Sequence, residues 1–387
     1  MKILQIIPFL SPKFGGTISV LDQLTKEFVK NNHSVTILTS DLELDKKLVK
    51  KFEESGITII PIHVVLNIGL FIYTPSVKKW VVENLKSFDI IHMHTFRSYQ
   101  NNIVSKYAKQ YRIPYIVQAH GSVLPFFEKQ NLKKMYDYVW GDKMLHFASK
   151  VIALTNTESE QYQKMGVPRN KIEIIPNGLD LSQFLDIPQK GKFKSKYQIP
   201  EKEKVILFLG RIHRIKGIDL LISAYPEILK EFPDAQLVIV GPDDNYLSII
   251  QEHIAQLKIN KKPLFTGALY GLEKLEAYVD ADVYVLPSLY ETFPMTLLEA
   301  MVCGTPVIIT NNIKNFDWIQ NKSGYIIEND PDDLVRQISV LFNDETLRQS
   351  LGENGKELVK TTFNFTPMIL STEKLYLQTI RESVENT

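Results

Sequence analysis

Two glutamates, Glu291 and Glu299, lie in the run PSLYETFPMTLLEAMVCGTPVI (residues 287–308), and their spacing suits recognition of a charged ligand that also carries hydroxyl groups. The run predicts a helix over about 294–302, which follows an apolar strand and stops before Gly304, a residue type favoured just past a helix end. The free N–H groups and the positive dipole end of that helix favour an anion above the preceding strand.

The predicted start of this helix carries further signals of an anion site. Thr292 can cap it, and Pro294 suits its first position, where a missing N–H costs nothing. A carboxylate beside a bound anion is favourable only where it accepts hydrogen bonds from a neutral part of the same ligand. Glu299 is suited to the two vicinal hydroxyls of a ribose and Glu291 to those of a sugar ring, so the pattern indicates a nucleotide diphosphate sugar.

A second cluster places two cations in a single connection. The run VILFLGRIHRIKGIDLLISAY (residues 205–225) predicts a buried strand, a turn at Gly210 and a helix that begins near Ile218. Arg211 and Lys216 fall between them, at the carboxyl end of the strand, where open α/β sheets bind ligands. Fixed cations there would stabilise the negative charge that a departing nucleoside diphosphate gains.

The N-terminal part of the sequence predicts the order strand, loop, helix, strand, which is typical of a parallel sheet. Gly15 and Gly16 lie in its first loop, where missing side chains let backbone N–H groups approach a phosphate. His94 and His120 end two further strand-like runs, and we expect both near the carboxyl edge of this sheet. We expect His92 to point away from His94 and to lie in the core.

These clusters resemble the retaining glycosyltransferases of family 4, and the resemblance covers nearly the whole chain. The run with Glu291 and Glu299 is similar to the E-x7-E motif of that family, and the stretch with Arg211 and Lys216 to its G-R-x-x-x-x-K-G element. The resemblance implies an α/β chain of the GT-B fold, with two Rossmann-like parallel-sheet domains that face each other across a cleft. We expect an acceptor-binding domain over 1–185, a nucleotide-sugar-binding domain over 186–365, and a last helix over 366–387 that crosses back to the first domain.

The same resemblance assigns roles to individual residues. In the family the first glutamate contacts donor-sugar hydroxyls, the second holds the ribose, the backbone between them binds phosphate, and a histidine lies beside the reacting sugar. The resemblance implies catalytic roles for His120, Arg211, Lys216 and Glu291, an acceptor-side contact for His94, and donor-binding roles for Gly15, Gly16, Asn177, Arg211, Lys216, Glu291, Thr292, Phe293, Pro294, Met295 and Glu299.

We expect no metal ion and no cofactor besides the donor, which would be a UDP-, GDP- or ADP-sugar. The chain contains Asp280-Ala281-Asp282, a spacing that holds divalent ions in other glycosyltransferases. Here it precedes the predicted strand VYVLP instead of following it, so both carboxylates would lie at the wrong end of that strand. We interpret the motif as a turn between a helix and a strand.

Composition narrows the partners and the compartment. The net charge of +1 gives no reason to expect nucleic acid, and the single cysteine, Cys303, excludes an intrachain disulfide and suits a reducing compartment. The apolar stretch 57–73 contains Pro61 and Asn67 and predicts a core strand and a loop instead of a membrane span. The basic amphipathic stretch 44–56 either packs on its own domain or docks on anionic lipid.

Together these observations predict a cytoplasmic, metal-independent, retaining glycosyltransferase at the inner face of the cell membrane. Its partners would be a nucleotide-sugar donor and a glycan or polyprenyl-diphosphate-linked acceptor, and the resemblance implies a role in O-antigen, capsule or exopolysaccharide synthesis. Two alternatives stay open: a nucleotide-sugar epimerase of the same fold, which needs no acceptor, and a non-catalytic module that binds sugar nucleotides.

Overall fold

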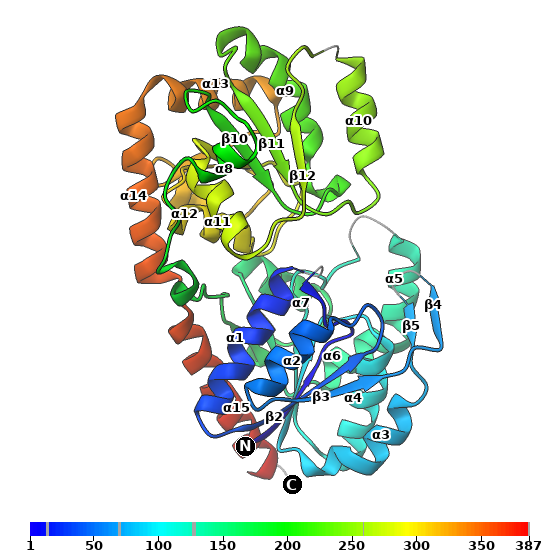
Figure 1. The fold of residues 1–387 in the computed structure, drawn as a ribbon. Coiled ribbons are helices and arrows are strands. Elements are labelled where there is room, and N and C mark those ends of the chain that lie inside the picture. The colour runs from blue at the N-terminus through cyan, green and yellow to red at the C-terminus, as the bar shows by residue number, and fades with distance from the viewer. Residues whose placement is uncertain (13–14, 69–70, 126–128, 258, 386–387) are drawn as a thin grey trace. The chain divides into compact units, whose positions relative to one another are not determined.

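The computed structural model describes residues 1–12, 15–68, 71–125, 129–257 and 259–385 of the 387-residue chain. The chain forms two compact units, which are described separately: unit 1 comprises Met1–Gly178 and Phe365–Thr387, and unit 2 comprises Leu179–Asn364 (Figure 1). Each unit contains its own parallel sheet between helices, so the predicted α/β class with two parallel-sheet domains is confirmed.

Unit 1 has a seven-stranded sheet in which all pairs of neighbouring strands are parallel. Its strands are β1 (Lys2–Ile6), β2 (Ser34–Ser40), β3 (Thr58–Ile62), β6 (Ile90–His94), β7 (Tyr115–Gln118), β8 (Lys150–Ala153) and β9 (Ile172–Ile174). They lie in the order β3-β2-β1-β6-β7-β8-β9. Its helices are α1 (Gly16–Lys30), α2 (Lys46–Glu54), α3 (Val77–Asn84), α4 (Tyr99–Tyr111), α5 (Gln130–Tyr136), α6 (Asp142–Phe147), α7 (Asn156–Lys164) and α15 (Phe365–Glu385).

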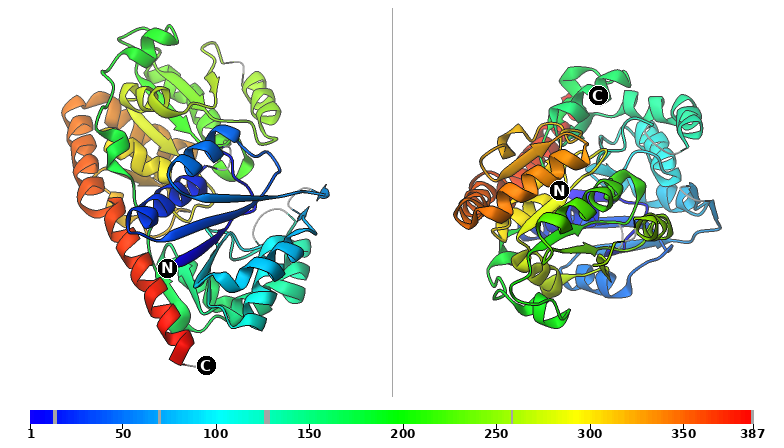
Figure 2. Two further views of the ribbon diagram at one scale, coloured as in Figure 1. Left: turned by 60° about the horizontal axis from the view of Figure 1, so that its bottom comes forward. Right: turned by 90° about the horizontal axis from the view of Figure 1, so that it is seen from above.

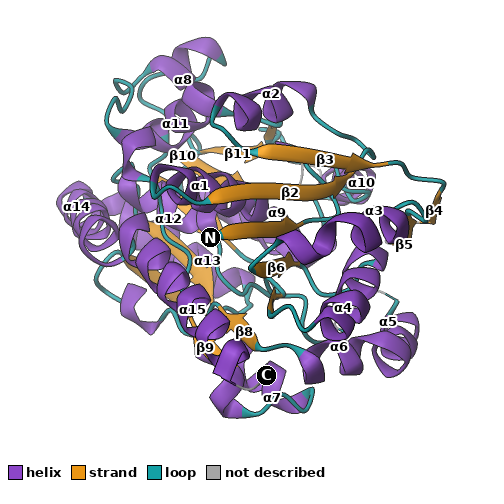
Figure 3. Cartoon of the chain, turned by 90° about the horizontal axis from the view of Figure 1, so that it is seen from below, coloured by secondary structure: helices purple, strands orange, loops and turns teal. Residues whose placement is uncertain are grey.

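Both faces of this sheet are covered, which explains why its central strands are almost continuously apolar. Ile3 of β1 packs in the cluster that contains residues of α1 and α15, whereas Leu4 packs in the cluster that contains residues of α3 and α4. Figure 3 shows α1 and α15 on one side of the strands and α3 and α4 on the other. The last helix of the chain therefore belongs to the core of unit 1, and Figure 2 shows it in red beside the blue α1.

The apolar stretch 57–73 forms β3 and then a small antiparallel hairpin of β4 (Leu66–Ile68) and β5 (Phe71–Tyr73). Pro61 is tolerated because β3 is an edge strand of the sheet. The amphipathic stretch 44–56 forms α2, whose Phe52 is fully buried in the core, so this helix packs on its own unit. No helix in the described part of the chain is long and apolar enough to cross a membrane.

Unit 2 has a six-stranded parallel sheet in the order β12-β11-β10-β13-β14-β15. Its strands are β10 (Val205–Leu209), β11 (Gln236–Val240), β12 (Leu264–Gly267), β13 (Val283–Leu286), β14 (Val307–Thr310) and β15 (Gly324–Ile327). Its helices are α8 (Lys192–Lys196), α9 (Ile218–Glu231), α10 (Leu247–Gln256), α11 (Gly271–Asp280), α12 (Met295–Val302), α13 (Pro331–Asn343) and α14 (Glu345–Thr362).

In each sheet the early strands are added on one side of the first strand, and the later strands are added on its other side. In unit 1 this change lies between β1 and β6, and in unit 2 between β10 and β13. The connections that leave the two central strands then diverge, and the crevice that opens at their carboxyl ends is where open α/β sheets bind ligands. The topology thus singles out one edge of each sheet as the place to look for a site.

Candidate active site

Lys216 and Glu291 form an ion pair at the switch point of unit 2. Lys216 lies in the loop that follows β10, and Glu291 lies in the loop that follows the adjacent β13. The two loops also touch through their backbones, since Leu289 N donates to Ile215 O at 2.8 Å. The Lys216 and Glu291 side chains are only 18% and 12% exposed, so their electrostatic interaction is weakly screened. The structure therefore brings these two predicted residues together.

Gly217 allows the two loops to lie this close. Its φ is 63°, a left-handed conformation, and a Cβ added to it would lie 2.0 Å from the carbonyl oxygen of Pro287. Any larger residue would push the backbone away from β13 and move Lys216, its neighbour in the sequence. The glycine of the predicted K-G pair thus has a structural reason at this position.

Glu291 has a second partner that fixes its position. Ser288 Oγ donates to Glu291 Oε1 at 2.9 Å, and Thr310 Oγ1 of β14 donates to the Ser288 carbonyl at 2.7 Å. Ser288 and Thr310 are both fully buried. The loop after β13 is therefore tied to the next strand as well as to the loop after β10.

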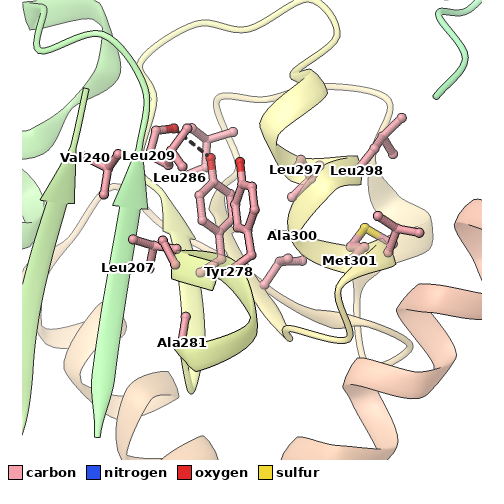
Figure 4. Close-up of a cluster of buried hydrophobic side chains, with 14 of the residues drawn as sticks. Leu207, Leu209, Val240, Tyr278, Ala281, Leu286, Leu297, Leu298, Ala300 and Met301 are labelled. Carbon is pink, nitrogen blue, oxygen red and sulfur yellow. Dashed lines mark hydrogen bonds between the residues drawn. The ribbon is translucent and has the colours of Figure 1, made fainter. Parts of the chain in front are cut away.

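Glu299 lies on α12 and is held from the neighbouring helix α11. Lys274 Nζ donates to Glu299 Oε1 at 2.7 Å, and Tyr278 Oη donates to Glu299 Oε2 at 3.0 Å. Burial, with the negative charge of Glu299 beside it, raises the pKa of Tyr278 well above its ordinary value, so the phenol stays a donor. Figure 4 shows Tyr278 between strand residue Leu207 and Ala300 of α12.

The hydroxyl of Tyr284 on β13 links the end of β10 to α12. The Tyr284 hydroxyl donates to the Leu209 carbonyl at 3.2 Å, at the end of β10, and lies 2.7 Å from Thr296 Oγ1 on α12. Burial raises the pKa of Tyr284, and the charges of Glu291 and Glu299 raise it further.

The backbone between the glutamates forms the start of α12, as predicted, but its cap differs from the prediction. Pro294 is the residue before the helix instead of its first residue, and no side chain caps the helix. Thr292 is therefore not the cap: its hydroxyl lies 3.2 Å from the Tyr290 hydroxyl. Phe293 packs against Phe316 and other aromatic rings, and Met295 is buried, so both side chains belong to the core. What this segment can offer an anion is backbone N–H groups.

Arg211 shares its loop with Lys216 but has a different partner. Its guanidinium pairs with Asp244, in the loop that follows β11, and its side chain is 50% exposed. The two predicted cations are thus both at the carboxyl edge of the sheet, but Arg211 is much more open to solvent than Lys216.

In unit 1 the two predicted histidines meet at the carboxyl ends of adjacent strands. His94 ends β6, His120 follows β7, and His94 Nδ1 lies 2.9 Å from His120 Nε2. Burial lowers the pKa of His120 to about 3 and that of His94 well below its ordinary value, the charges of nearby histidines adding to the effect on His94. Both rings are therefore neutral near pH 7. His120 has a φ of 49°, which marks a sharp turn at the end of its strand.

The prediction for His92 was half wrong. His92 is fully buried, as expected, but its ring lies on the same side of β6 as that of His94, with 4.1 Å between the ring centroids. Residues two apart on a strand share a face, so His92 had to point the same way. Its Nδ1 lies 2.6 Å from the Tyr376 hydroxyl of α15.

The remaining predicted residues of unit 1 follow the carboxyl ends of β1 and β9, at the same edge of the sheet. Gly15, with φ 66°, is the residue before α1, and Gly16 is the first residue of that helix. Asn177 follows β9 and is 5% exposed, and its Oδ1 has no hydrogen-bond partner among the residues that the structure describes. A buried amide oxygen without a partner is free to accept from a ligand or from water.

Comparison with known families decides what these two units are. The model described as "Glycosyltransferase Family 4" matches residues 14–183, and the model described as "Glycosyl transferases group 1" matches residues 189–358. The chain belongs to the family 4, group 1 glycosyltransferases.

Individual relatives match three quarters or more of this glycosyltransferase. The N-acetyl-alpha-D-glucosaminyl L-malate synthase of Bacillus anthracis is 25% identical over 96% of this chain and 96% of its own. An Escherichia coli UDP-Gal:alpha-D-GlcNAc-diphosphoundecaprenol alpha-1,3-galactosyltransferase is 26% identical over 76% of each chain. The crystal structure of Anabaena Alr3699/HepE in complex with UDP and glucose matches with a TM-score of 0.80 and 17% identity, over 98% of this chain and 100% of that chain. The fold of this glycosyltransferase is therefore GT-B.

Several side chains of the glycosyltransferase site were missed by sequence reasoning. Lys274 and Tyr278, which hold Glu299, are four residues apart on α11 and so share one face, but nothing in the sequence shows that this face meets α12. Asp244 was missed because its pairing with Arg211 depends on the order of the strands.

Glu158 is a further missed residue, and it supports the loop that carries His120. Its Oε1 accepts from Gly121 N and its Oε2 from Leu154 N, each at 2.7 Å. Thr155 caps α7 by accepting from Glu158 N at 3.2 Å, so the spacing Thr-x-x-Glu was a signal that could have been noticed. Burial raises the pKa of Glu158 to about 7 despite these hydrogen bonds.

Asp280 and Asp282 have structural partners at the amino end of β13. Asp280 ends α11 and accepts from Gly191 N and Lys194 N, while Asp282 accepts from Val205 N at 2.8 Å. This is the turn between a helix and a strand that the sequence predicts, at the opposite edge of the sheet from Lys216.

Proposed function

We propose that this glycosyltransferase transfers a sugar, with retention of configuration, from a UDP-, GDP- or ADP-sugar to a glycan or polyprenyl-diphosphate-linked acceptor, without a metal ion. The observation that carries the proposal is the Lys216–Glu291 ion pair at the switch point of unit 2, in the loop that leads into α12, the helix that carries Glu299. The cation and the backbone N–H groups suit the diphosphate of a nucleotide sugar. The two carboxylates suit the hydroxyls of its ribose and of its sugar.

Lys216 and Glu291 form an ion pair with each other. A donor diphosphate would compete for Lys216, and Glu291 would then be free to accept hydrogen bonds from sugar hydroxyls. Glu299 would accept from the ribose while Lys274 and Tyr278 hold it in place. Binding would thus exchange one set of charge-assisted hydrogen bonds for another.

In the proposed reaction the bond between the sugar C1 and the leaving phosphate oxygen breaks, and the acceptor oxygen bonds to C1 from the same face. The acceptor proton passes to the departing phosphate oxygen, so charge and atoms balance without a covalent enzyme intermediate. Lys216 and Arg211 would stabilise the charge that develops on the diphosphate. His120 would contact the reacting sugar, and His94, through its contact with His120, would lie on the acceptor side.

The decisive experiment is incubation with a panel of UDP-, GDP- and ADP-sugars, with and without glycan and polyprenyl-diphosphate acceptors. We expect nucleoside diphosphate release that depends on the acceptor, and a product whose new bond keeps the anomeric configuration of the donor. A free, altered sugar formed without acceptor would instead indicate an epimerase, and binding without turnover would indicate a non-catalytic module.

We further propose that unit 1 contacts an anionic membrane at the cytoplasmic face, where a lipid-linked acceptor for surface polysaccharide synthesis would be held. The support is an exposed apolar patch at α5, the following π-helical turn (Asp137–Gly141) and the β4–β5 hairpin. We define the patch by its exposed side chains, Val65, Leu66, Ile68, Phe71, Leu132, Met135, Tyr138, Val139 and Trp140.

Both parts of the patch flank the start of α4. Tyr73 of β5 packs edge-on against Tyr99 with 4.9 Å between ring centroids, and the Tyr136 hydroxyl of α5 donates to the Ser98 carbonyl at 3.0 Å. Exposed Lys129, Lys134 and Lys143 lie on the same segment, with Asp142 as an exposed acid among them. Exposed tyrosine and tryptophan beside lysines is the composition that favours the interface of an anionic bilayer.

A further inference from the structure

A chain of buried polar side chains links the last helix to His120 inside unit 1. Gln5 lies on β1, His94 on β6 and Tyr376 on α15, and all three are fully buried. They lie on the sheet face that α15 covers (Figure 3). Three hydrogen bonds connect them to one another and to His120.

The direction of the first bond fixes that of the second. Gln5 Nε2 donates to the Tyr376 hydroxyl at 3.1 Å, so Gln5 Oε1 faces His94 Nε2, 2.8 Å away. An amide oxygen can only accept, so the hydrogen of this bond must be on His94 Nε2.

His94 then decides which nitrogen of His120 carries a hydrogen. Burial lowers the pKa of His94 well below its ordinary value, so the ring is neutral and has one N–H. With that hydrogen on Nε2, His94 Nδ1 is an acceptor, and His120 Nε2 at 2.9 Å must donate to it. A neutral His120 with a hydrogen on Nε2 has a lone pair on Nδ1.

The hydrogen bonds of Tyr376, at the other end of this series of polar side chains, agree with the same order of donors and acceptors. The Tyr376 oxygen accepts from Gln5, and its own hydrogen is directed at His92 Nδ1, 2.6 Å away. Burial raises the pKa of Tyr376, so the phenol keeps this hydrogen. His92 then carries its hydrogen on Nε2, a buried atom that has no hydrogen-bond partner among the residues that the structure describes.

We propose that Gln5 and Tyr376 are positioning residues that hold His120 as the Nε2–H tautomer, with Nδ1 left to accept a hydrogen bond from a substrate hydroxyl. Only the last clause rests on the proposed function. A helix that follows unit 2 in the sequence thereby sets the hydrogen-bonding character of a residue that precedes unit 2, and His120 acts as an acceptor instead of a proton donor.

The test measures the ring-nitrogen chemical shifts of the chain's eight histidines by NMR in the full-length, isotope-labelled protein, with assignment by single His→Gln variants. In the wild-type protein we expect His120 to be protonated on Nε2 alone. Tyr376→Phe keeps the ring but removes the acceptor of Gln5 Nε2, and Gln5→Met removes the acceptor of His94 Nε2–H. In both variants we expect His120 to become a mixture of two tautomers.

Tyr115→Phe is the matched control, because it also removes one buried phenol of unit 1, whose hydroxyl donates to the Met144 carbonyl at 2.6 Å. We expect the His120 signals to be unchanged in this variant. Where transfer is measured, Gln5→Met and Tyr376→Phe should lower kcat by about two- to fivefold with little change in the donor KM, since the rate falls in proportion to the competent population.

Two NMR results would overturn the proposal: a hydrogen on Nδ1 of His120 in the wild-type protein, or an unchanged His120 tautomer in both Gln5→Met and Tyr376→Phe. These measurements need no turnover, so their failure is distinct from failure of the proposed transferase activity. A changed tautomer with unchanged kcat would overturn the contact between His120 Nδ1 and the substrate.

Discussion

Lys216 and Glu291 are 75 residues apart in the sequence, yet their side chains form an ion pair because β10 and β13 are neighbours in the sheet. The pair joins the loop that follows β10 to the loop that follows β13. Each residue is the charged partner of the other, so substitution of one leaves the other without that partner.

Lys216→Ala should lower kcat more than it raises the donor KM, because the charge on the diphosphate grows as the bond breaks. By analogy with other preorganised charge stabilisers the loss is about 2 to 4 kcal/mol of transition-state stabilisation. Arg211→Ala should also lower kcat more than it raises the donor KM, but the loss should be smaller, since the Arg211 side chain is 50% exposed. Arg214→Ala, an exposed cation of the same loop, is the control. Steady-state kinetics of the three variants check this, and near-normal turnover of both Lys216→Ala and Arg211→Ala would remove the leaving-group role.

Glu299→Ala should weaken binding of a free nucleoside diphosphate, because the ribose would lose its acceptor. Glu291→Ala should leave that binding nearly unchanged and impair transfer, because its proposed partners exist only on the intact donor. The loss of one charged hydrogen-bond partner is about 1.5 to 3 kcal/mol. Isothermal calorimetry with UDP, GDP and ADP decides the matter, with Glu353→Ala, an exposed glutamate of α14, as control. Equal weakening by both substitutions would show that the assignment of one glutamate to sugar and the other to ribose is mistaken.

Chelation by EDTA should leave transfer largely intact. The reason is that Lys216 and Arg211 lie at the edge of the sheet that would receive the diphosphate, whereas Asp280 and Asp282 accept backbone N–H groups at the opposite edge. Activity is measured before and after chelation, and after addition of Mg²⁺ or Mn²⁺. Complete loss on chelation with recovery on adding either ion would mean that the reaction uses a metal.

Tyr138→Ala combined with Trp140→Ala should reduce binding to vesicles that contain anionic lipid by about tenfold or more, since burying a large apolar side chain contributes about 1.5 to 3 kcal/mol. Tyr270→Ala, which removes an exposed tyrosine of unit 2, is the control. Co-sedimentation with anionic and with zwitterionic vesicles measures the effect and its charge dependence. Equal sedimentation of the double variant and the control would rule out the patch as the contact.

Stability should rise with pH between about 4.5 and 6.5, because buried histidines are neutral in the folded chain and protonated in the unfolded chain. Burial lowers the pKa of His92 and of His120 to about 3, and lowers that of His94 as well. Glu158 acts in the opposite direction: its folded pKa is raised to about 7, so the folded state holds a proton that the unfolded state has lost.

Two substitutions test these signs. The slope of the unfolding free energy against pH reports the difference in bound protons between the unfolded and the folded state. His92→Gln should lower that difference by about one proton, and Glu158→Gln should raise it by about one proton. Urea denaturation at several pH values between 4.5 and 6.5 gives the slopes. A Glu158→Gln slope that is equal to or smaller than the wild-type slope would contradict the raised pKa.

The sequence predicts local elements well where their signals are local. The apolar run at Val205–Leu209 and the glycine after α12 fix the ends of those elements to within about a residue. The sequence does not predict the short edge strand β15, because three or four apolar residues without alternation do not distinguish a strand from a loop.

The sequence could not predict which side chains form hydrogen bonds or ion pairs with the predicted site residues. Glu299 was predicted as a ligand contact, but its bonds to Lys274 and Tyr278 depend on how α11 packs beside α12. The same holds for Arg211, whose pairing with Asp244 follows from β10 and β11 being neighbours. The His92 error differs in kind, since the two-residue period of a strand was sufficient to avoid it.

Unit 2 is an insertion between two parts of unit 1, and the ends of the insertion lie side by side, since Leu179 N donates to Phe363 O at 2.8 Å. Residues 179–364 can therefore be expressed as one continuous fragment, whereas unit 1 would have to be rejoined from two pieces. The order in which the parts of unit 1 fold during synthesis is also constrained. Gln5 Nε2 donates to Tyr376 of α15, which follows unit 2 in the sequence, so unit 1 can complete this part of its core only after residues 179–364 have been synthesised.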